Sequence, residues 1–390
     1  MQTNAFPIAR VAVLTLVLLL SGGCGEGPDS QVSPSADAEA RLRAILELPT
    51  ALPRAAALTA LLQSLGPRDV PAVARAIDHG RSDMDEVAGA VIASWWTSFD
   101  PETAYAHGVE STVTGNALWR RTVLQEWALS DPEAVLRVVQ EIPAGDPERV
   151  RDATRALISG WFYTDAPPDP LLPLIEPLPL GRARNETIDR FLNAMAEHRG
   201  VEATIEFVEA MGEGEANFKL QFYRRLATAV AQRDPQRAIA WAQEHAAGPY
   251  GANLLRRVGA RWGWVAGEPA MEWALGLPAS EERDGIVRET YRGFRMRARE
   301  RADAWMRGQQ PSPVLEPAYG IYLIGVARDD PREALRLLDG VVDETLKDRL
   351  IVAVARSWMK TEPEAAETWL QGAGLSSELA RRVRDDSASP

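Results

Sequence analysis

The residue types that most often carry out catalysis or bind metal ions are few in this chain and stand far apart. The sequence has one cysteine and four histidines, and no two histidines lie at the close spacing of a helical metal-ligand pair. It has no glycine-rich phosphate loop and no Gly-x-Ser-x-Gly turn. We therefore expect a protein that is not an enzyme and that uses no metal ion and no cofactor.

Arginine is the side chain whose placement points most clearly to binding. The chain is acidic overall, with a net charge of −12, yet arginines gather in the segments that precede a series of acidic-Pro dipeptides. A guanidinium group can hold a carboxylate or a phosphate through two hydrogen bonds, which would suit an acidic partner. The same arginines could instead pair with acids of neighbouring segments, and both interpretations stay open. The overall acidity argues against nucleic acid as the partner.

Tryptophan is the second candidate, because an exposed indole can anchor a peptide or stack on a sugar ring. Four of the twelve tryptophans stand five residues before the proline of such a dipeptide, which predicts that they pack between helices: Trp96, Trp127, Trp264 and Trp358. Two others, Trp95 and Trp262, lie outside this column, so that core packing and an exposed ring are both open for them. The candidate partner-binding residues are Trp95, Arg224, Arg225, Arg256, Arg257, Arg261, Trp262, Arg292 and Arg295.

The acidic-Pro dipeptides mark a repeat of about 33 residues. The six clear copies contain Pro101, Pro132, Pro235, Pro269, Pro331 and Pro363, and the three adjacent pairs are separated by 31, 34 and 32 residues. The longer gaps leave room for degenerate copies, so that about ten units are expected. A repeat of this length is typical of helical arrays, in which each unit buries its apolar face against its neighbours.

Each unit is predicted to form two helices. An acidic residue followed by proline favours a helix start, and four alanines that come three residues after the proline would let helices approach closely: Ala104, Ala238, Ala334 and Ala366. Before the proline, the residues at positions −5 and −9 are apolar and share one helical face. No strand-like alternation is evident, which predicts an all-α fold. Residues 166–181 contain six prolines and form either a hinge or a short, kinked second helix.

The unit length and the small residue of the second helix resemble tetratricopeptide-type helical hairpins over about residues 60 to 380. The first helix departs from that family's motif, because its usual small residue is replaced by Ile, Val, Leu or Tyr in most copies. The resemblance implies a right-handed superhelical α-solenoid of about ten helix-turn-helix units, with the first helices lining the concave side. The groove would then be basic inside an acidic shell.

The N-terminus is predicted to be a targeting segment. An apolar run, Val11 to Leu20, follows Arg10 and is too short to span a bilayer. The residues up to Cys24 resemble a bacterial lipoprotein signal, although the large aliphatic residue stands four positions before the cysteine and not three. The resemblance implies a signal peptide of residues 1–23, lipidation of Cys24 and, with Gly25 next, sorting to the outer membrane, facing the periplasm. A secreted protein with an incidental cysteine is the alternative.

Composition divides the remainder into a flexible tether at residues 24–38, the helical array at residues 39–383 and a disordered tail at residues 384–390. The leading expectation is a membrane-tethered scaffold of the bacterial cell envelope that binds a partner protein or peptide through its basic groove. The alternative is an envelope polysaccharide-binding or -processing protein, which would need Trp95 with Glu86, or Trp262 with a distant acid. A structural spacer without a partner is the third interpretation.

Overall fold

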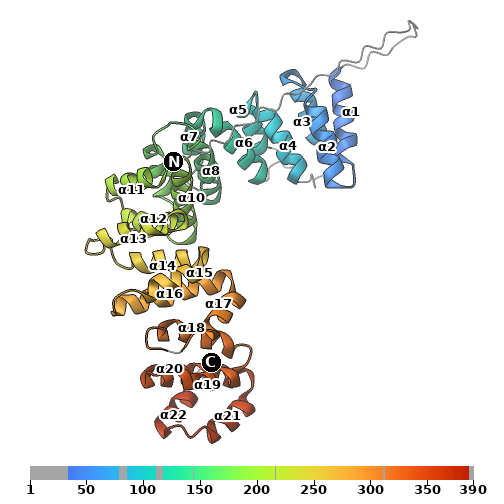
Figure 1. Cartoon of the computed structure of the whole chain (residues 1–390). Helices are drawn as coiled ribbons and strands as arrows, with labels where there is room; N and C mark the ends of the chain where they lie inside the picture. The colour runs from blue at the N-terminus through green and yellow to red at the C-terminus, as the bar shows by residue number, and fades with distance from the viewer. Residues whose placement is uncertain are drawn as a thin grey trace, which may run out of the picture. The chain divides into compact units, whose positions relative to one another are not determined.

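The computed structural model describes residues 34–78, 86–110, 117–143, 145–215, 217–310 and 312–385. The chain divides into two compact units, residues 1–80 and 81–390, where the sequence predicts one continuous array. The described residues are helical and contain no strand, which confirms the all-α prediction (Figure 1). None of the described helices is both long and apolar enough to cross a membrane. The predicted signal peptide and Cys24 lie outside the described residues.

The first unit contains three α-helices in its described part, α1 (Pro34–Leu46), α2 (Ala51–Leu62) and α3 (Val70–Asp78), with a 3-10 turn, η1 (Pro67–Asp69), before α3. Helix α1 packs against both α2 and α3. It begins at Pro34, within the segment that composition assigned to the flexible tether. The helix extends this far because Ala38 and Leu42 lie one turn apart and are both buried.

The second unit contains nineteen α-helices in its described part. Their bounds are α4 (Glu86–Thr97), α5 (Pro101–Glu110), α6 (Ala117–Ser130), α7 (Pro132–Gln140), α8 (Pro147–Trp161), α9 (Leu172–Ile175), α10 (Arg182–His198), α11 (Val201–Ala210), α12 (Phe218–Arg233), α13 (Pro235–Glu244), α14 (Leu254–Val265), α15 (Gly267–Leu275), α16 (Glu281–Arg297), α17 (Arg299–Arg307), α18 (Glu316–Ala327), α19 (Pro331–Leu337), α20 (Glu344–Thr361), α21 (Pro363–Gly372) and α22 (Ser377–Asp385). The last helix takes in Arg384 and Asp385, which composition assigned to the tail.

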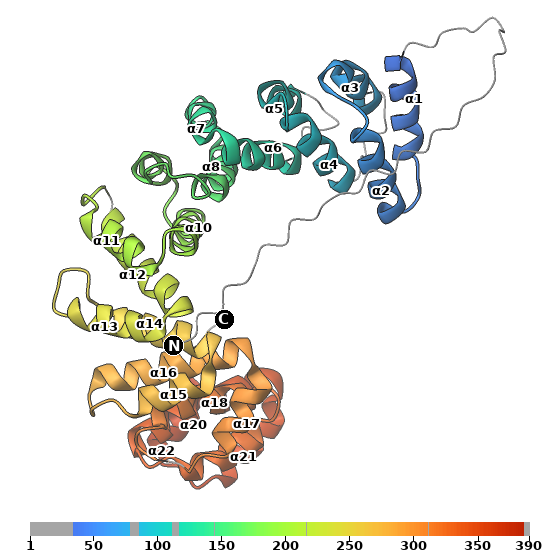
Figure 2. The same ribbon diagram turned by 45° about the horizontal axis from the view of Figure 1, so that its top comes forward.

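The even-numbered helices from α4 to α20, here called the first helices, pack each against the next along the chain. Most odd-numbered helices, the second helices, pack against the two first helices beside them, as α5 does against α4 and α6, and α13 against α12 and α14. In Figure 2, α5 and α7 lie on one side of the row that α4, α6 and α8 form. Each helix of this unit therefore contacts mainly the helices that stand next to it, or next but one, along the chain.

The helix pairs recur with a strict period in the C-terminal half. Five residues that immediately precede a second helix share φ near −140° and ψ between 70° and 93°, and each stands 32 residues after the one before: Asp234, Ala266, Ala298, Asp330 and Glu362. Helix α15 accordingly begins at Gly267, two residues before the proline that marked its start in the sequence. The predicted register of this unit is therefore wrong by two residues. Trp262 and Val258 occupy its buried column, in place of Trp264 and Ala260.

Aspartate caps the second helices, as the dipeptides predict. The carboxylates of Asp131, Asp234 and Asp330 accept hydrogen bonds from backbone N–H groups three residues further on, at 2.9, 2.9 and 3.0 Å, and each cap stabilises its helix by about 1 kcal/mol. The prediction is wrong for Glu362, whose longer side chain turns away and accepts a hydrogen bond from Trp358 Nε1 at 3.3 Å.

The alanines after the prolines are buried, which confirms the prediction of close helix approach at this position. Ala104, Ala238, Ala334 and Ala366 are at most 1% exposed, and Ala270 and Ala302 occupy the same position of the corrected register with 0% exposure.

The proline-rich segment folds as a 3-10 turn, η2 (Asp169–Leu171), followed by the single turn of α9. Its apolar side chains Leu171 and Ile175 are fully buried. This favours the short, kinked second helix over the hinge. The remaining 3-10 turn, η3 (Leu338–Gly340), follows α19.

Candidate partner-binding surface

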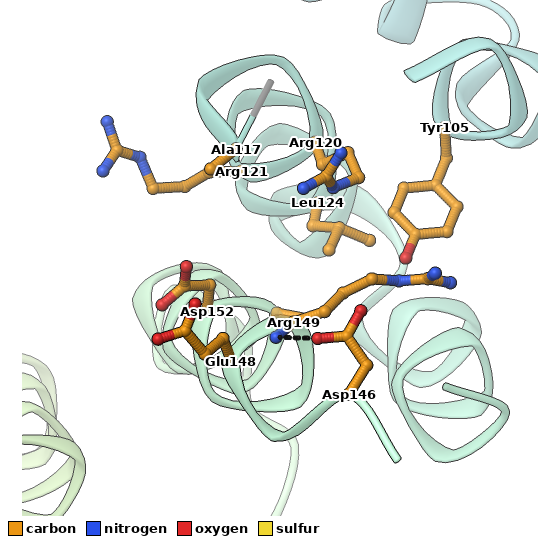
Figure 3. A pocket seen from close by; sticks show the side chains of 10 residues that line it. Tyr105, Ala117, Arg120, Arg121, Leu124, Asp146, Glu148, Arg149 and Asp152 are labelled. Carbon is orange, nitrogen blue, oxygen red and sulfur yellow. Dashed lines mark hydrogen bonds between the residues drawn. The ribbon is translucent and has the colours of Figure 1, made fainter. Parts of the chain in front are cut away.

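Two cavities of the second unit are lined by arginines. One, of about 170 Å³, lies between α5, α6 and α8 (Figure 3). The other, of about 350 Å³, lies along α12, α14 and α16. Three arginines that the sequence singled out line the second cavity: Arg257 and Arg261 of α14, and Arg292 of α16.

The second cavity forms where two first helices touch. A Cβ atom added to Gly293 would lie 2.0 Å from the carbonyl oxygen of Ala260, and one added to Gly263 would lie 2.1 Å from that of Thr290. Only glycine permits this approach of α14 and α16. The larger side chains of both helices, among them Trp264 and Met296, stand beside the contact and line the cavity.

An exposed indole ring lines this cavity. Trp264 is 36% exposed, and the guanidinium carbons of Arg261 and Arg297 lie 4.5 and 5.0 Å from its ring centroid, within the range of cation–π attraction. Met296 and Val265 are 77% and 48% exposed. Aromatic, methionine and arginine side chains together are typical of the central part of a protein interface.

The exposure of the tryptophans differs from the sequence prediction for this unit. Trp264 was expected to pack in the core and is exposed, because the unit's register begins two residues earlier. Trp262 is only 8% exposed and packs against Trp273 with ring centroids 5.5 Å apart. Of the two interpretations left open for Trp262, the structure selects core packing.

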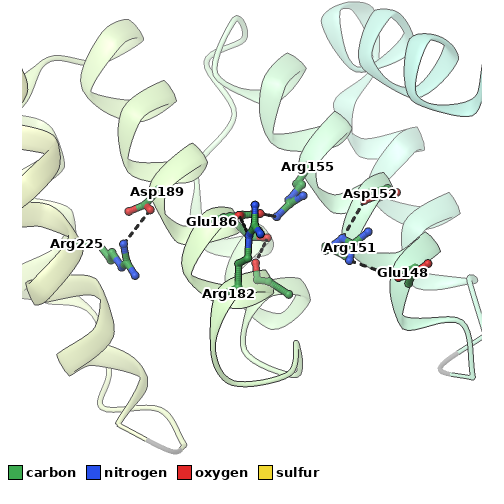
Figure 4. Close-up of polar contacts among 10 residues, drawn as sticks. Glu148, Arg151, Asp152, Arg155, Arg182, Glu186, Asp189 and Arg225 are labelled. Atoms are coloured by element: carbon green, nitrogen blue, oxygen red, sulfur yellow. Dashed lines mark hydrogen bonds and ion pairs between the residues drawn. The ribbon is translucent and has the colours of Figure 1, made fainter. Parts of the chain in front are cut away.

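Asp189 of α10 faces the arginines of α12 and α14. Arg225 Nη1 lies 3.0 Å from its carboxylate (Figure 4). Burial raises the pKa of the Asp189 carboxyl, although the nearby Arg225 and Arg261 act in the opposite direction. We call Asp189, Arg224, Arg225, Arg257, Arg261, Trp264, Arg292 and Met296 the arginine surface.

Positive charge exceeds negative charge in this cluster. Burial lowers the pKa of Arg257, the guanidinium groups of Arg224 and Arg225 lower it further, and the Asp189 carboxylate acts in the opposite direction. Burial likewise lowers the pKa of Arg261, against the raising effect of Asp189. The side chain of Arg257 forms no hydrogen bond or ion pair with a described residue, and its Nε atom is buried. A half-buried cation that forms no direct ion pair is unfavourable in the free protein, so that the cluster is suited to receive an anionic group.

Other sequence candidates do not face the cavity. Arg295 pairs with Asp303 at 2.7 and 3.1 Å and lies against Gly325 of α18. Arg256 lies against Gly285 of α16. For Arg295 the structure therefore selects pairing, and for Arg256 it selects packing between first helices. Arg292 lines the cavity while paired with Glu289 at 2.9 Å.

Trp95 is half-buried and packs edge-on against Phe99, with ring centroids 4.8 Å apart. Glu86, the acid considered with it for a polysaccharide site, lines a shallow cavity along α4 and α6 whose lining does not include Trp95. The structure therefore does not bring this ring and this acid together at one site, as the sequence-based interpretation requires.

Sequence reasoning missed Asp189, Trp264 and Met296 as parts of the surface. Asp189 and Met296 belong to a different repeat unit from the arginines of α14 that they adjoin. A single sequence does not reveal contacts of this kind between units. Trp264 was assigned to the core by the proline of its unit. The period of 32 residues that relates Trp241, Trp273 and Trp305 is the signal that corrects this register.

Comparison with known protein families, characterised protein sequences and solved structures finds no match for this chain. Among the described residues, no group of three or more His, Cys, Asp or Glu side chains is placed to hold a metal ion.

Proposed function

We propose that the protein is a helical-repeat α-solenoid that binds a partner protein or peptide through the arginine surface, without turnover. The row of first helices, each packed against the next, supports the solenoid. The observation that carries the binding role is Arg257, a half-buried cation without an ion pair in the described residues, beside the exposed ring of Trp264.

The chemistry of the surface defines the partner. Arg257 and Arg261 are placed to receive carboxylates, and Trp264 with Met296 offers an adjacent apolar contact. A bare anion would leave the apolar contact unused, whereas a peptide segment with acidic and apolar side chains would use both. The proposed partner is therefore acidic at the contact.

The location belongs to the same proposal. Cys24 would carry a lipid anchor, and the protein would be a tethered scaffold of the bacterial cell envelope, at the outer membrane and facing the periplasm. The sequence around Cys24 supports this, as does its Gly25.

The test is affinity capture from native membranes with the double variant Arg257→Glu and Arg261→Glu. The control carries two reversals on second helices, Arg137→Glu of α7 and Arg336→Glu of α19, so that net charge changes equally. Circular dichroism checks that both variants keep their helical content. The proposal expects loss of a partner only in the first variant, and equal capture by both variants would contradict it.

A polysaccharide ligand is the second candidate, and the exposed indole of Trp264 favours it, since such rings stack on sugars. Binding to purified cell-wall polymer that is lost in Trp264→Ala and retained in the Arg257→Glu and Arg261→Glu double variant would select this candidate over the acidic peptide.

A further inference from the structure

The smaller cavity between α5, α6 and α8 is separate from the arginine surface and has its own set of donors. Tyr105 of α5, Arg120 and Arg121 of α6 and Arg149 of α8 line it (Figure 3). Its volume of about 170 Å³ admits a small molecule or a terminal group of a larger one, since one water molecule occupies about 30 Å³.

Two donors at this cavity are buried and unsatisfied within the described structure. Tyr105 is 9% exposed, and its hydroxyl has no hydrogen-bond partner there. The Nε atom of Arg149 is also buried without a partner, and no ion pair of Arg149 is formed with a described residue. Figure 3 shows the Tyr105 hydroxyl directed toward the Arg149 side chain. Buried donors of this kind are rare, because each forfeits its hydrogen bonds to water.

The acids around the cavity are already engaged with other groups. Asp146 accepts a hydrogen bond from the backbone N–H of Arg149 at 3.0 Å and so caps α8. Asp152 pairs with Arg151 at 2.9 Å, and Glu148 lies 3.9 Å from the same guanidinium (Figure 4). None of these contacts satisfies the side chain of Arg149 or the Tyr105 hydroxyl.

We propose that this cavity binds a small oxyanion of the phosphate type. Its oxygens accept hydrogen bonds from the Tyr105 hydroxyl and the Arg149 guanidinium, and Arg120 adds positive charge from α6. The N-terminal end of α8 lies at the same cavity and favours negative charge further. The bound group is either inorganic phosphate or the terminal phosphate of a small organic molecule.

Thermal unfolding of the full chain tests this site with inorganic phosphate and, in a second arm, glycerol phosphate, both against chloride at equal ionic strength. Three variants accompany the unaltered protein: Tyr105→Phe, Arg149→Gln and Arg257→Gln. Phosphate raises the unfolding midpoint of the unaltered protein and of Arg257→Gln. The apparent affinity falls about tenfold in Tyr105→Phe, the effect of one lost hydrogen bond to a charged group, and binding is lost in Arg149→Gln.

The midpoint without phosphate separates this role from a structural one. Because the Tyr105 hydroxyl has no hydrogen-bond partner among the described residues, Tyr105→Phe keeps or raises that midpoint while it weakens phosphate binding. The proposal is overturned if phosphate and glycerol phosphate leave the unaltered protein unchanged. It is equally overturned if the phosphate effect persists in Arg149→Gln and disappears in Arg257→Gln, which would place the anion on the arginine surface. A response to inorganic phosphate alone identifies the free ion, and an equal or larger response to glycerol phosphate identifies a terminal phosphate group.

Discussion

The Asp303 carboxylate of α17 accepts two hydrogen bonds from the Arg295 guanidinium of α16, at 2.7 and 3.1 Å. Both side chains are 14% exposed. The hydroxyl of Tyr291 also donates to this carboxylate, at 3.1 Å, and burial, followed by the interaction with Asp303, raises the pKa of Tyr291. The Asp303 carboxylate thus joins α16 and α17, the two helices of a unit in which the sequence has no acidic-Pro dipeptide.

Replacing this carboxylate should destabilise the protein. Asp303→Asn leaves the Arg295 guanidinium buried without a counter-charge, and we expect the free energy of unfolding to fall by about 3 kcal/mol in urea denaturation. The matched control is Asp329→Asn, which removes the exposed partner of Arg299; both of its side chains are at least half exposed, and a change below about 1 kcal/mol is expected. Equal losses in the two variants would show that burial does not decide the strength of these pairs.

A buried alanine that stands three residues after the first residue of a second helix should not tolerate replacement by a larger side chain. Ala238 is 0% exposed, so that Ala238→Leu overfills the contact between α13 and the first helices, and a loss of about 2 kcal/mol is expected. Ala240 stands on the exposed side of the same helix, and Ala240→Leu there is expected to change stability little. Thermal and urea unfolding of the pair measure the difference, and a tolerated Ala238→Leu would refute close packing at this position.

The sequence predicts the helices well because local rules govern their starts. Asp131, Asp234 and Asp330 cap helices where the dipeptides place them, and the alanines that follow are buried. Prediction fails at Ala266 and Ala298, where the same backbone conformation occurs without aspartate or proline. There the Phe294 ring lies against Gly267 and the Trp262 ring packs against Trp273, contacts that the residue types at the helix start do not reveal.

The candidate surface is predicted less well, because it depends on contacts between units. A window of sequence shows that arginines gather in the first helices, but the partner of each one stands in another helix. Arg225 forms an ion pair with Asp189, thirty-six residues away, whereas Arg257 forms no ion pair with a described residue. Sequence alone could therefore not separate the arginines that form an ion pair from those that form none.

Tyr250 should titrate later than a free tyrosine. Its hydroxyl donates to the Glu213 carboxylate, and this hydrogen bond raises the pKa of Tyr250 to about 12. The folded state then keeps a proton that the unfolded chain loses near pH 10, so the stabilisation is complete below pH 10 and is lost as the pH rises toward 12. Tyrosine absorbance of the unaltered protein minus that of Tyr250→Phe gives the titration curve. Glu213→Ala should move it back toward 10, and Glu215→Ala should not.

Arg257 and Arg225 should respond oppositely to the same substitution, although they belong to one cluster. Arg257→Met removes a half-buried cation that forms no ion pair with a described residue and that lies near two other guanidinium groups, so the free energy of unfolding should rise by about 1 kcal/mol. Arg225→Met leaves the Asp189 carboxylate without its partner at 3.0 Å, and stability should fall. Urea denaturation at neutral pH compares the two variants.

Both substitutions should weaken capture of an acidic partner, because each removes a positive charge from the arginine surface. A gain in stability together with a loss of binding in Arg257→Met would mean that the unpaired arginine is retained for its ligand and not for the fold. If Arg257→Met instead destabilises the protein as much as Arg225→Met does, the guanidinium has a structural partner after all, and the cluster loses the imbalance of charge on which its binding role depends.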